Sequence, residues 1–231
     1  EISACLVGSE MCIRDRTWSV FHDPEGLSSL LGGHELMVAR LDSMFTAPNT
    51  FNYGTYGFVI HEIAEMVALN MGQYAHGNQP VQHAIYLYNY VGQPWKTQYH
   101  TRNVMNKLYN SGPEGYCGDE DNGQTSAWYV FTALGFYPVC PGTSEYVLGS
   151  PLFPKATLTL PGEKIFTIYA EGVSDANCYI RSAELNAKGF TRNYLKHEEL
   201  VGGGEFRLVM DSVPNIERGI HLEDFPYSYS K

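Results

Sequence analysis

The first half of the chain repeats apolar residues at helical spacing. Across residues 26–45, leucine, methionine, valine and phenylalanine recur every three or four positions, as on the buried face of a helix. The pair Gly32-Gly33 predicts a break within that run. Similar patterns predict further helices over residues 56–71, 83–90, 97–109 and 126–134. The last pattern stops at Gly135, a glycine position typical of a helix C-terminus.

The pattern changes from helical to strand-like near Pro138. Residues 139–231 are punctuated by proline and glycine, and apolar and polar positions alternate with period two. Segments 165–170 and 179–185 are candidate strands. Two further segments place apolar side chains on one face, at Ala156, Leu158 and Leu160 and again at Phe206, Leu208 and Met210. Helices followed by strands indicate an α+β fold rather than a parallel α/β fold.

Composition and charge exclude several classes of partner. The formal net charge is -10 with only 15 Lys and Arg, which argues against a nucleic-acid surface, because phosphates are bound by clustered cations. The same charge disfavours binding to an anionic membrane, and no apolar run has transmembrane length. The five cysteines lack zinc-site spacing, and whether Cys117 and Cys140 meet in space stays open. The sequence therefore predicts no nucleic-acid and no membrane partner.

The run 118–129 contains the densest candidate chemistry. Asp119, Glu120 and Asp121 crowd into a short turn flanked by glycines. Crowded carboxylates repel one another unless a cation, a proton or a substrate compensates, so the run is typical of a functional site. The alternative is a solvated acidic turn that caps the next helix, with Thr125 or Ser126 as the N-cap.

The same run does not encode an EF-hand calcium loop. That loop needs an oxygen ligand at its fifth position, which is Gly123 here, and a glutamate at its twelfth, which is Val130. A hard cation would therefore take its ligands from separate segments of the chain.

Several ordered blocks of sequence resemble one protein family. They are residues 18–23 (WSVFHD), 72–80 (GQYAHGNQP), 86–90 (YLYNY), 92–98 (GQPWKTQ), 118–128 (GDEDNGQTSAW) and 135–142 (GFYPVCPG). Together they resemble the C-terminal part of glycoside hydrolase family 92, over residues 17 to about 215. The resemblance implies an N-terminal β-sandwich followed by an (α/α)6 helical barrel, of which this chain would hold the last helical hairpins and a strand-rich tail.

The resemblance also predicts how the chain is divided. Residues 1–16 match nothing and are interpreted as a non-native segment. Residues 17–143 are expected to form part of the helical barrel catalytic domain, and residues 144–231 a β-rich C-terminal region. The N-terminal domain of the same protein is then a missing partner of this chain.

In chemistry, the resemblance implies a calcium-dependent, inverting exo-α-mannosidase. By matching position, Asp121 is the expected general base, with Asp119 as its partner or alternative. Asn78 and Gln79 are the expected calcium ligands, together with the acidic loop. Two alternatives stay open: the aspartates serve only as caps or cation ligands, or the two amides merely end a loop and cap a helix.

Three more residues are expected to bind the substrate. By position, His61 and Glu62 match a pair that contacts the leaving sugar in family members preferring α-1,2 linkages. The alternative is an exposed polar step on an amphipathic helix. Trp95 offers an aromatic face on which a sugar can stack, although packing in the core is its alternative role.

The general acid of the family has no clear counterpart. The matching spacing falls on Glu10, whose neighbours differ from the family segment, and His76 and His83 are interpreted as structural. The parent protein is expected to remove terminal α-linked mannose from N-glycans or mannan, with α-1,2 as the expected linkage. The substrate type implies a secreted or periplasmic location. The alternatives are a non-catalytic carbohydrate-binding fragment and another glycoprotein-deglycosylating hydrolase.

Overall fold

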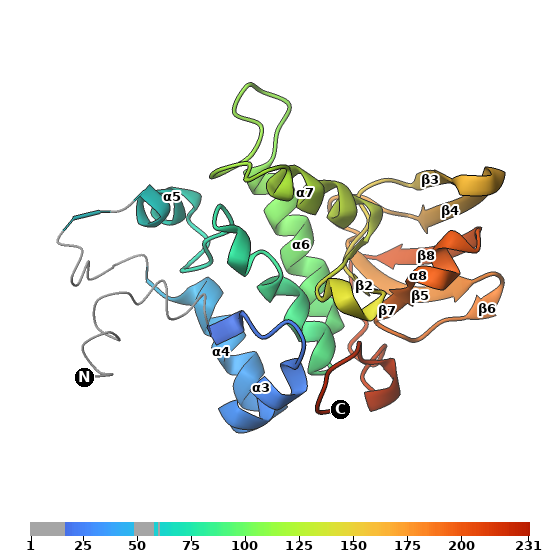
Figure 1. Ribbon diagram of the computed structural model, residues 1–231, viewed down its shortest axis with the longest axis horizontal. Helices are drawn as coiled ribbons and strands as arrows, with labels where there is room; N and C mark the ends of the chain where they lie inside the picture. Colours follow the sequence, from blue (N-terminus) through green and yellow to red (C-terminus); the bar gives the residue numbers. More distant parts are fainter. Residues whose placement is uncertain (1–16, 49–57, 60) are drawn as a thin grey trace.

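The computed structural model describes residues 17–48, 58–59 and 61–231, the side chains of residues 61 and 62 excepted. Helices occupy one side of the molecule and β-strands the other (Figure 1). The predicted order of helices followed by strands is confirmed, and the fold is a mixed one of helix and sheet. Residues 1–16, which were predicted to be a non-native segment, lie outside the described residues.

The first two helices are separated by the predicted glycine break. Helix α3 spans Pro24–Leu31, and the Asp23 carboxylate caps its N-terminus by accepting a backbone hydrogen bond. The helix ends at Gly32, whose left-handed backbone (φ 99°) favours a residue without a Cβ. Helix α4 then runs over His34–Thr46 and buries one apolar face.

Among the described residues, five more helical elements precede the first strand. They are α5 (His61–Leu69), η2 (Gln79–Val81), η3 (Ala84–Tyr90), α6 (Pro94–Leu108) and α7 (Gln124–Leu134). Part of the predicted helix 56–71 lies outside the described residues, and the predicted helix 83–90 is a 3₁₀ helix. Every residue of η3 is buried, so tertiary packing on all sides, rather than one apolar face, sets its conformation.

The predicted N-cap of α7 is wrong. Gly123, with φ 91°, is the residue that precedes the helix, and the Glu120 carboxylate from the acidic turn accepts the Ser126 N–H at 3.2 Å in the first helical turn. The Thr125 hydroxyl donates instead to the Asp119 carbonyl at 2.8 Å, and the Ser126 hydroxyl donates to the Glu120 carboxylate at 2.9 Å. Both hydroxyls therefore hold the acidic loop rather than the helix terminus.

The strands form two sheets. The small antiparallel sheet has the order β1-β2-β7, from Phe136–Tyr137, Glu145–Leu148 and Tyr194–Lys196. The larger sheet has the order β3-β4-β8-β5-β6, from Lys155–Leu160, Lys164–Glu171, Gly204–Asp211, Tyr179–Leu185 and Lys188–Gly189. The pairing of β4 with β8 is parallel and the other pairings are antiparallel. A short helix, α8 (His197–Val201), leads from β7 to β8.

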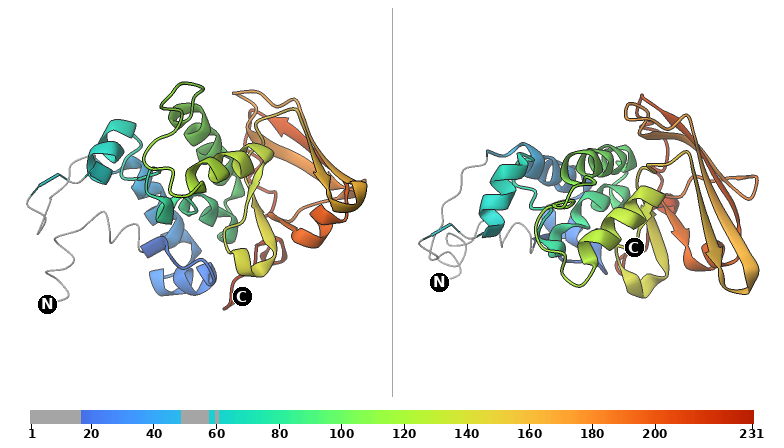
Figure 2. Two further views of the ribbon diagram at one scale, coloured as in Figure 1. Left: turned by 45° about the horizontal axis from the view of Figure 1, so that its top comes forward. Right: turned by 90° about the horizontal axis from the view of Figure 1, so that it is seen from above.

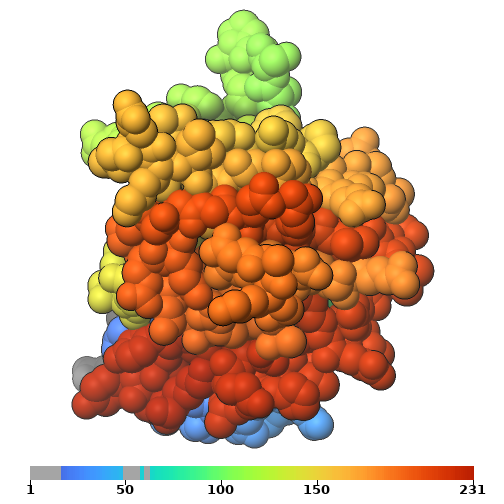
Figure 3. Space-filling view, turned by 90° about the vertical axis from the view of Figure 1, so that its right-hand side faces the viewer, coloured from blue at the N-terminus to red at the C-terminus, as the bar shows by residue number. Residues whose placement is uncertain are grey.

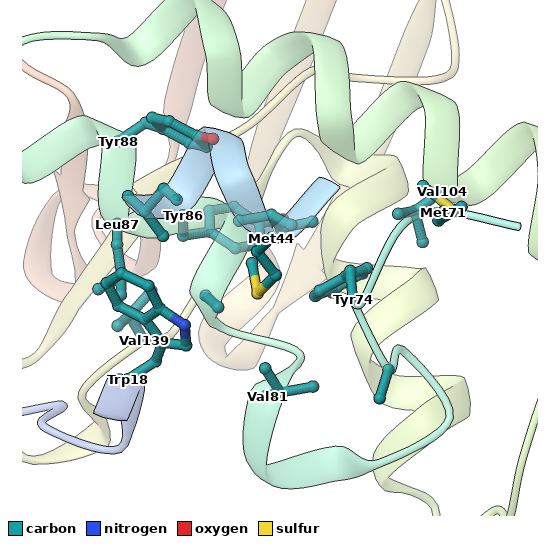
Figure 4. Close-up of a cluster of buried hydrophobic side chains, with 14 of the residues drawn as sticks. Trp18, Met44, Met71, Tyr74, Val81, Tyr86, Leu87, Tyr88, Val104 and Val139 are labelled. Carbon is teal, nitrogen blue, oxygen red and sulfur yellow. The ribbon is translucent and has the colours of Figure 1, made fainter. Parts of the chain in front are cut away.

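The buried apolar side chains form two clusters. One gathers the helical elements around η3 and α6, and its centre includes Tyr74, Tyr86 and Tyr88 (Figure 4). The other packs the small sheet against the larger sheet. The predicted inward face of the later strand is confirmed, since Phe206, Leu208 and Met210 are all buried.

Side chains of α6 tie the helices to the larger sheet. The Arg102 guanidinium donates to the carbonyls of Ser174, at 2.9 Å, and of Pro151. Gln98 accepts the Ile180 N–H at 2.9 Å, at the start of β5. Burial lowers the pKa of Arg102, which is held by carbonyl dipoles rather than by a carboxylate.

The C-terminal tail runs back across the molecule to the first helices. Figure 3 shows this tail, in dark red, directly beside the N-terminal helices in blue. Figure 2 shows the C-terminus on the helical side of the small sheet. The tail therefore joins the two ends of the described chain.

The cysteines in the described residues are free thiols. Cys117, Cys140 and Cys178 form no disulfide, which answers the open question about Cys117 and Cys140. Burial raises the pKa of the Cys117 thiol to about 11, so it is a protonated, packed side chain near neutral pH.

Candidate functional site

A cavity of about 540 Å³ lies where η2, the acidic loop and the segment after β1 meet. Asp121 and Gln79 both line it, although 42 positions separate them in the sequence (121 minus 79). The other lining residues are Phe21, Pro80, His83, Gln124, Tyr137, Pro138, Val139 and Pro141. The structure thus brings one predicted base and one predicted metal ligand to the same cavity.

The acidic loop has an unusual backbone. Asp121 (φ 45°), Asn122 (φ 58°) and Gly123 (φ 91°) occupy the left-handed region in succession. Aspartate and asparagine are the non-glycine side chains that adopt this conformation most readily, so the sequence of the loop suits its backbone. This backbone turns the chain sharply at the cavity, directly before α7 begins.

A glycine contact joins the acidic loop to the segment before η2. A Cβ on Gly118 would lie 2.5 Å from both the Cα and the carbonyl oxygen of Gly77. Gly118 also has a left-handed backbone, with φ 70°. Both constraints exclude a side chain there, so the two segments approach at backbone contact distance.

The Gln79 amide holds the loop and leaves one oxygen available. Its Nε2 donates to the Asp119 carbonyl at 2.6 Å and to the Thr125 hydroxyl at 3.3 Å. Gln124 Nε2 donates to the Tyr137 hydroxyl at 2.7 Å. In the described part of the chain, neither Oε1 atom accepts a hydrogen bond, so both remain free to bind a ligand at the cavity.

This donor set fits a hard cation such as calcium. Calcium prefers six to eight oxygen ligands, and the cavity offers the Asp121 carboxylate and two amide oxygens, from Gln79 and Gln124. The described residues contain no cluster of three His, Cys, Asp or Glu side chains suited to a metal. A cation here would therefore depend on amide and carbonyl oxygens in addition to carboxylate.

Asn78 lies beside this donor set, at the position that precedes η2. Its side chain makes no capping hydrogen bond to that helix. Its backbone carbonyl accepts the Val81 N–H at 3.1 Å, as in a turn. The alternative to a metal role was that the Asn78 side chain caps η2. The structure does not contain this cap.

The two histidines near the cavity are buried and neutral. His83 contacts the cavity, and its Nε2 is 2.6 Å from the Trp18 carbonyl. Burial lowers the pKa of His83 to about 4 and that of His76 to about 3. A neutral imidazole is a very weak acid, so neither ring is suited to protonate a leaving group, in agreement with the structural role predicted for both.

Two other predicted site residues, Asp119 and Trp95, are not among the described residues that line this cavity. Asp119 contributes its backbone carbonyl to the Gln79 contact, while Trp95 begins α6 and donates from Nε1 to Gln93 Oε1 at 2.9 Å. His61 and Glu62 begin α5, and their side chains lie outside the described residues. The structure therefore gathers part of the predicted site and leaves the proposed leaving-sugar contacts untested.

Sequence reasoning missed two residues of the cavity. Gln124 and Tyr137 are hydrogen-bonded to each other across it. Gln124 directly follows the acidic loop, which is a local signal for a site role. Tyr137 gives no such signal, because only the pairing of β1 with β2 sets its position.

Known proteins with similar sequence and structure share one description. The model of the glycosyl hydrolase family 92 catalytic domain matches residues 9–212. An uncharacterised secreted glycosidase of Arthroderma benhamiae is 28% identical over 204 residues, which are 87% of this chain and 23% of that protein.

Two solved structures from Bacteroides thetaiotaomicron extend the comparison. An inverting mannosidase of family GH92 is 75% identical, with a TM-score of 0.81, over 93% of this chain and 29% of its own. An α-mannosidase of the same family, in complex with mannoimidazole, is 33% identical, with a TM-score of 0.83, over 94% of this chain and 27% of its own. The chain thus spans less than a third of these relatives. Because the family model covers most of its length, the chain belongs to glycosyl hydrolase family 92.

Proposed function

We propose that the whole protein is an exo-α-mannosidase that removes terminal α-1,2-linked mannose from N-glycans or mannan. The observation that carries the proposal is the convergence of Asp121 and Gln79 on one cavity. The similarity to two solved structures, an inverting mannosidase and an α-mannosidase bound to mannoimidazole, supports the same substrate class. The helical elements would be part of an (α/α)6 barrel completed by the remainder of the protein.

In the proposed reaction, Asp121 is the general base. Its exposed carboxylate takes a proton from a water molecule, and the water oxygen attacks the anomeric carbon. The bond from that carbon to the glycosidic oxygen breaks, and the departing oxygen takes a proton from an acid on the opposite face. In inverting enzymes the two carboxyl groups stand roughly 6.5–9.5 Å apart.

Calcium is the proposed cofactor, and Gln79, Asn78 and Gln124 are the proposed sources of oxygen ligands beside Asp121. When bound, the ion would supply a positive charge that polarises two mannose hydroxyls. The chain's own contribution is orientation. Gln79 fixes the Asp119 carbonyl with its Nε2 and presents its Oε1 at the cavity, so one amide joins the loop to the ligand.

The described residues supply the base side of this site, and the general acid would come from elsewhere in the protein. Hydrolysis is therefore proposed for the whole protein, not for these 231 residues alone. A non-catalytic carbohydrate-binding fragment remains the second candidate for the isolated chain.

A secreted or periplasmic location is part of the proposal. It is supported by the description of the Arthroderma relative as secreted. Within the described residues, no helix is both long and apolar enough to cross a membrane.

The test is incubation of the whole protein with α-1,2-mannobiose, with and without a calcium chelator, while NMR follows the first anomer released. The expected result is calcium-dependent release of the inverted anomer, β-mannose. Asp121→Asn should reduce turnover by about 10²–10⁴-fold, the range for loss of a general base. Asp175→Asn, an exposed aspartate beside α6, is the matched control. Mannose release by Asp121→Asn at the control rate would remove that residue from the mechanism.

A further inference from the structure

A chain of three polar side chains, two buried and one partly buried, lies beneath the acidic loop. The Tyr74 hydroxyl is 2.8 Å from His76 Nδ1, and His76 Nε2 is 2.8 Å from the Tyr109 hydroxyl. Tyr74 and His76 are both fully buried, and the imidazole meets the Trp128 ring edge-on, with centroids 4.3 Å apart. Figure 4 shows Tyr74 within the buried apolar cluster of the helical elements.

The direction of the hydrogen bonds follows from what each atom can donate. The Tyr109 hydroxyl lies 3.3 Å from the Thr125 carbonyl, and the Tyr74 hydroxyl lies 3.5 Å from the Gln82 carbonyl. If Tyr109 donates across the shorter of these two contacts, its oxygen accepts from His76 Nε2–H. A neutral imidazole carries one N–H, so Nδ1 accepts, and Tyr74 is its donor. A chain that runs from Tyr74 to Thr125 therefore requires the tautomer with the proton on Nε2.

The chain ends at the residues that hold the acidic loop. Thr125, whose carbonyl accepts from Tyr109, donates its own hydroxyl to the Asp119 carbonyl at 2.8 Å. Gln82 Nε2 donates to both the His76 carbonyl, at 3.2 Å, and the Thr125 hydroxyl, at 3.3 Å. His76 is thus connected by two routes to the turn that carries Asp121, one from its imidazole through Tyr109 and one from its backbone carbonyl through Gln82.

We propose that His76 is a positioning residue, which fixes the acidic loop through the one-way chain from Tyr74 to Thr125. The consequence for catalysis rests on the proposed mannosidase function, while the consequence for the order of the loop does not. His76 touches no lining side chain of the cavity in this role. It acts through Tyr109 and Thr125.

A purely packed core would not need these polar groups. Burying a hydroxyl or an imidazole is unfavourable unless each is hydrogen-bonded, and apolar side chains of similar shape would fill the same space. A satisfied buried network has one arrangement, whereas apolar packing tolerates several. Such an arrangement suits a loop whose Asp121 and Asn122 hold left-handed backbone conformations.

The first test measures the tautomer and the order of the loop in the 231-residue chain. Long-range ¹⁵N–¹H NMR at neutral pH should give the Nε2–H tautomer for His76. Tyr109→Phe should accelerate amide hydrogen exchange of Gln124 and Thr125 by about tenfold, the effect of one lost buried hydrogen bond. The matched control is Tyr86→Phe, which removes a buried hydroxyl bonded at 2.8 Å to Thr132, further along α7.

The second test measures kinetics in the whole protein. Tyr109→Phe and His76→Phe should lower kcat about 10-fold to 100-fold, since small displacements of a catalytic group cost that much, and leave KM within about twofold. His76→Gln, which can accept and donate, should recover part of kcat. Tyr86→Phe should leave kcat unchanged.

The outcomes separate the two proposals. An Nδ1–H tautomer, or equal exchange in Tyr109→Phe and Tyr86→Phe, would overturn the positioning role whatever the enzyme does. Absence of mannosidase activity in the unmodified protein would overturn the proposed function, while the exchange and tautomer results would still decide the role of His76. An equal loss of kcat in Tyr109→Phe, His76→Phe and the control Tyr86→Phe would also reject the positioning role of His76.

Discussion

Ser230 donates two hydrogen bonds to the carboxylate of Asp23, from its N–H at 2.9 Å and from its hydroxyl at 2.6 Å. Ser228 adds a third at 2.7 Å, and the Tyr229 N–H donates to the His22 carbonyl at 2.9 Å. The same carboxylate caps α3. One side chain therefore begins the first described helix and holds the last residues of the chain.

This contact predicts a stability effect at the C-terminus. Ser230→Ala should lower the free energy of unfolding by about 1 kcal/mol, the net value of a partly exposed hydrogen bond to a charged group. Ser212→Ala, at an exposed serine in a bend, is the control and should have almost no effect. Chemical denaturation followed by fluorescence measures both. An equal loss in the two variants would mean that the tail contact contributes nothing.

The same contact predicts a dependence on pH. The hydrogen bond from Ser230, followed by those from Ser228 and Gly26, lowers the pKa of Asp23 well below its usual range. A carboxylate with a lowered folded pKa contributes stability above its unfolded pKa, about 3.9, and loses it as pH falls through the folded value. The difference in unfolding free energy between the native chain and Asp23→Asn should therefore be full at pH 6 and shrink below about pH 4. A difference that grows on acidification would contradict this account.

The contact between Gly118 and Gly77 predicts a selective effect of one methyl group. Gly118→Ala should lower the free energy of unfolding by about 2 kcal/mol or more, because the added Cβ would overlap the backbone and the left-handed conformation adds strain. Gly142→Ala is the control, since nothing lies within 4 Å of its added Cβ. Thermal unfolding compares them. A normal melting temperature for Gly118→Ala would show that the two segments do not meet as described.

Arg102 predicts how strongly the helices depend on the larger sheet. Arg102→Met should cost about 2–3 kcal/mol, because the Ser174 and Pro151 carbonyls lose their buried donor. Lys107→Met, an exposed cation on the same helix, is the control. Urea denaturation monitored by circular dichroism gives both values. A loss confined to the control would place the stabilising contact elsewhere.

The cavity predicts a specific response to calcium. Calcium should raise the thermal midpoint of the chain, and magnesium should do so less, because magnesium demands a stricter octahedral shell. Gln79→Ala should abolish the shift, and Gln93→Ala, whose amide contacts Trp95 instead, should retain it. Differential scanning fluorimetry is the measurement. An unchanged calcium shift in Gln79→Ala would exclude that residue as a ligand.

Much of the helical part could be predicted from local signals. The break at Gly32 needed only a glycine pair in an apolar run, and the end of α7 at Gly135 followed the same logic. The 3₁₀ conformation of η3 could not be predicted in this way, because burial on every side is a property of the assembled molecule. The Thr125 hydroxyl was assigned to a helix cap for a similar reason: its true partner, the Asp119 carbonyl, lies on a loop whose path the sequence does not specify.

For the site, the acidic loop was recognisable because crowded carboxylates are costly. Its meeting with Gln79 was expected only through the family resemblance. The positions of Gln124 and Tyr137 depend on the loop backbone and on the pairing of β1 with β2, which no periodicity encodes. The tail contact of Asp23 was invisible for the same reason, since 207 positions separate its partners.

The place of β8 in the larger sheet has a consequence for biosynthesis. This strand is the last of the sheet in sequence, yet it lies between β4 and β5. Until the ribosome releases residues 204–211, the sheet consists of two unjoined hairpins with open edges. The sheet can therefore close only after residue 211 has emerged, and such long-range pairing forms slowly and leaves strand edges exposed until then.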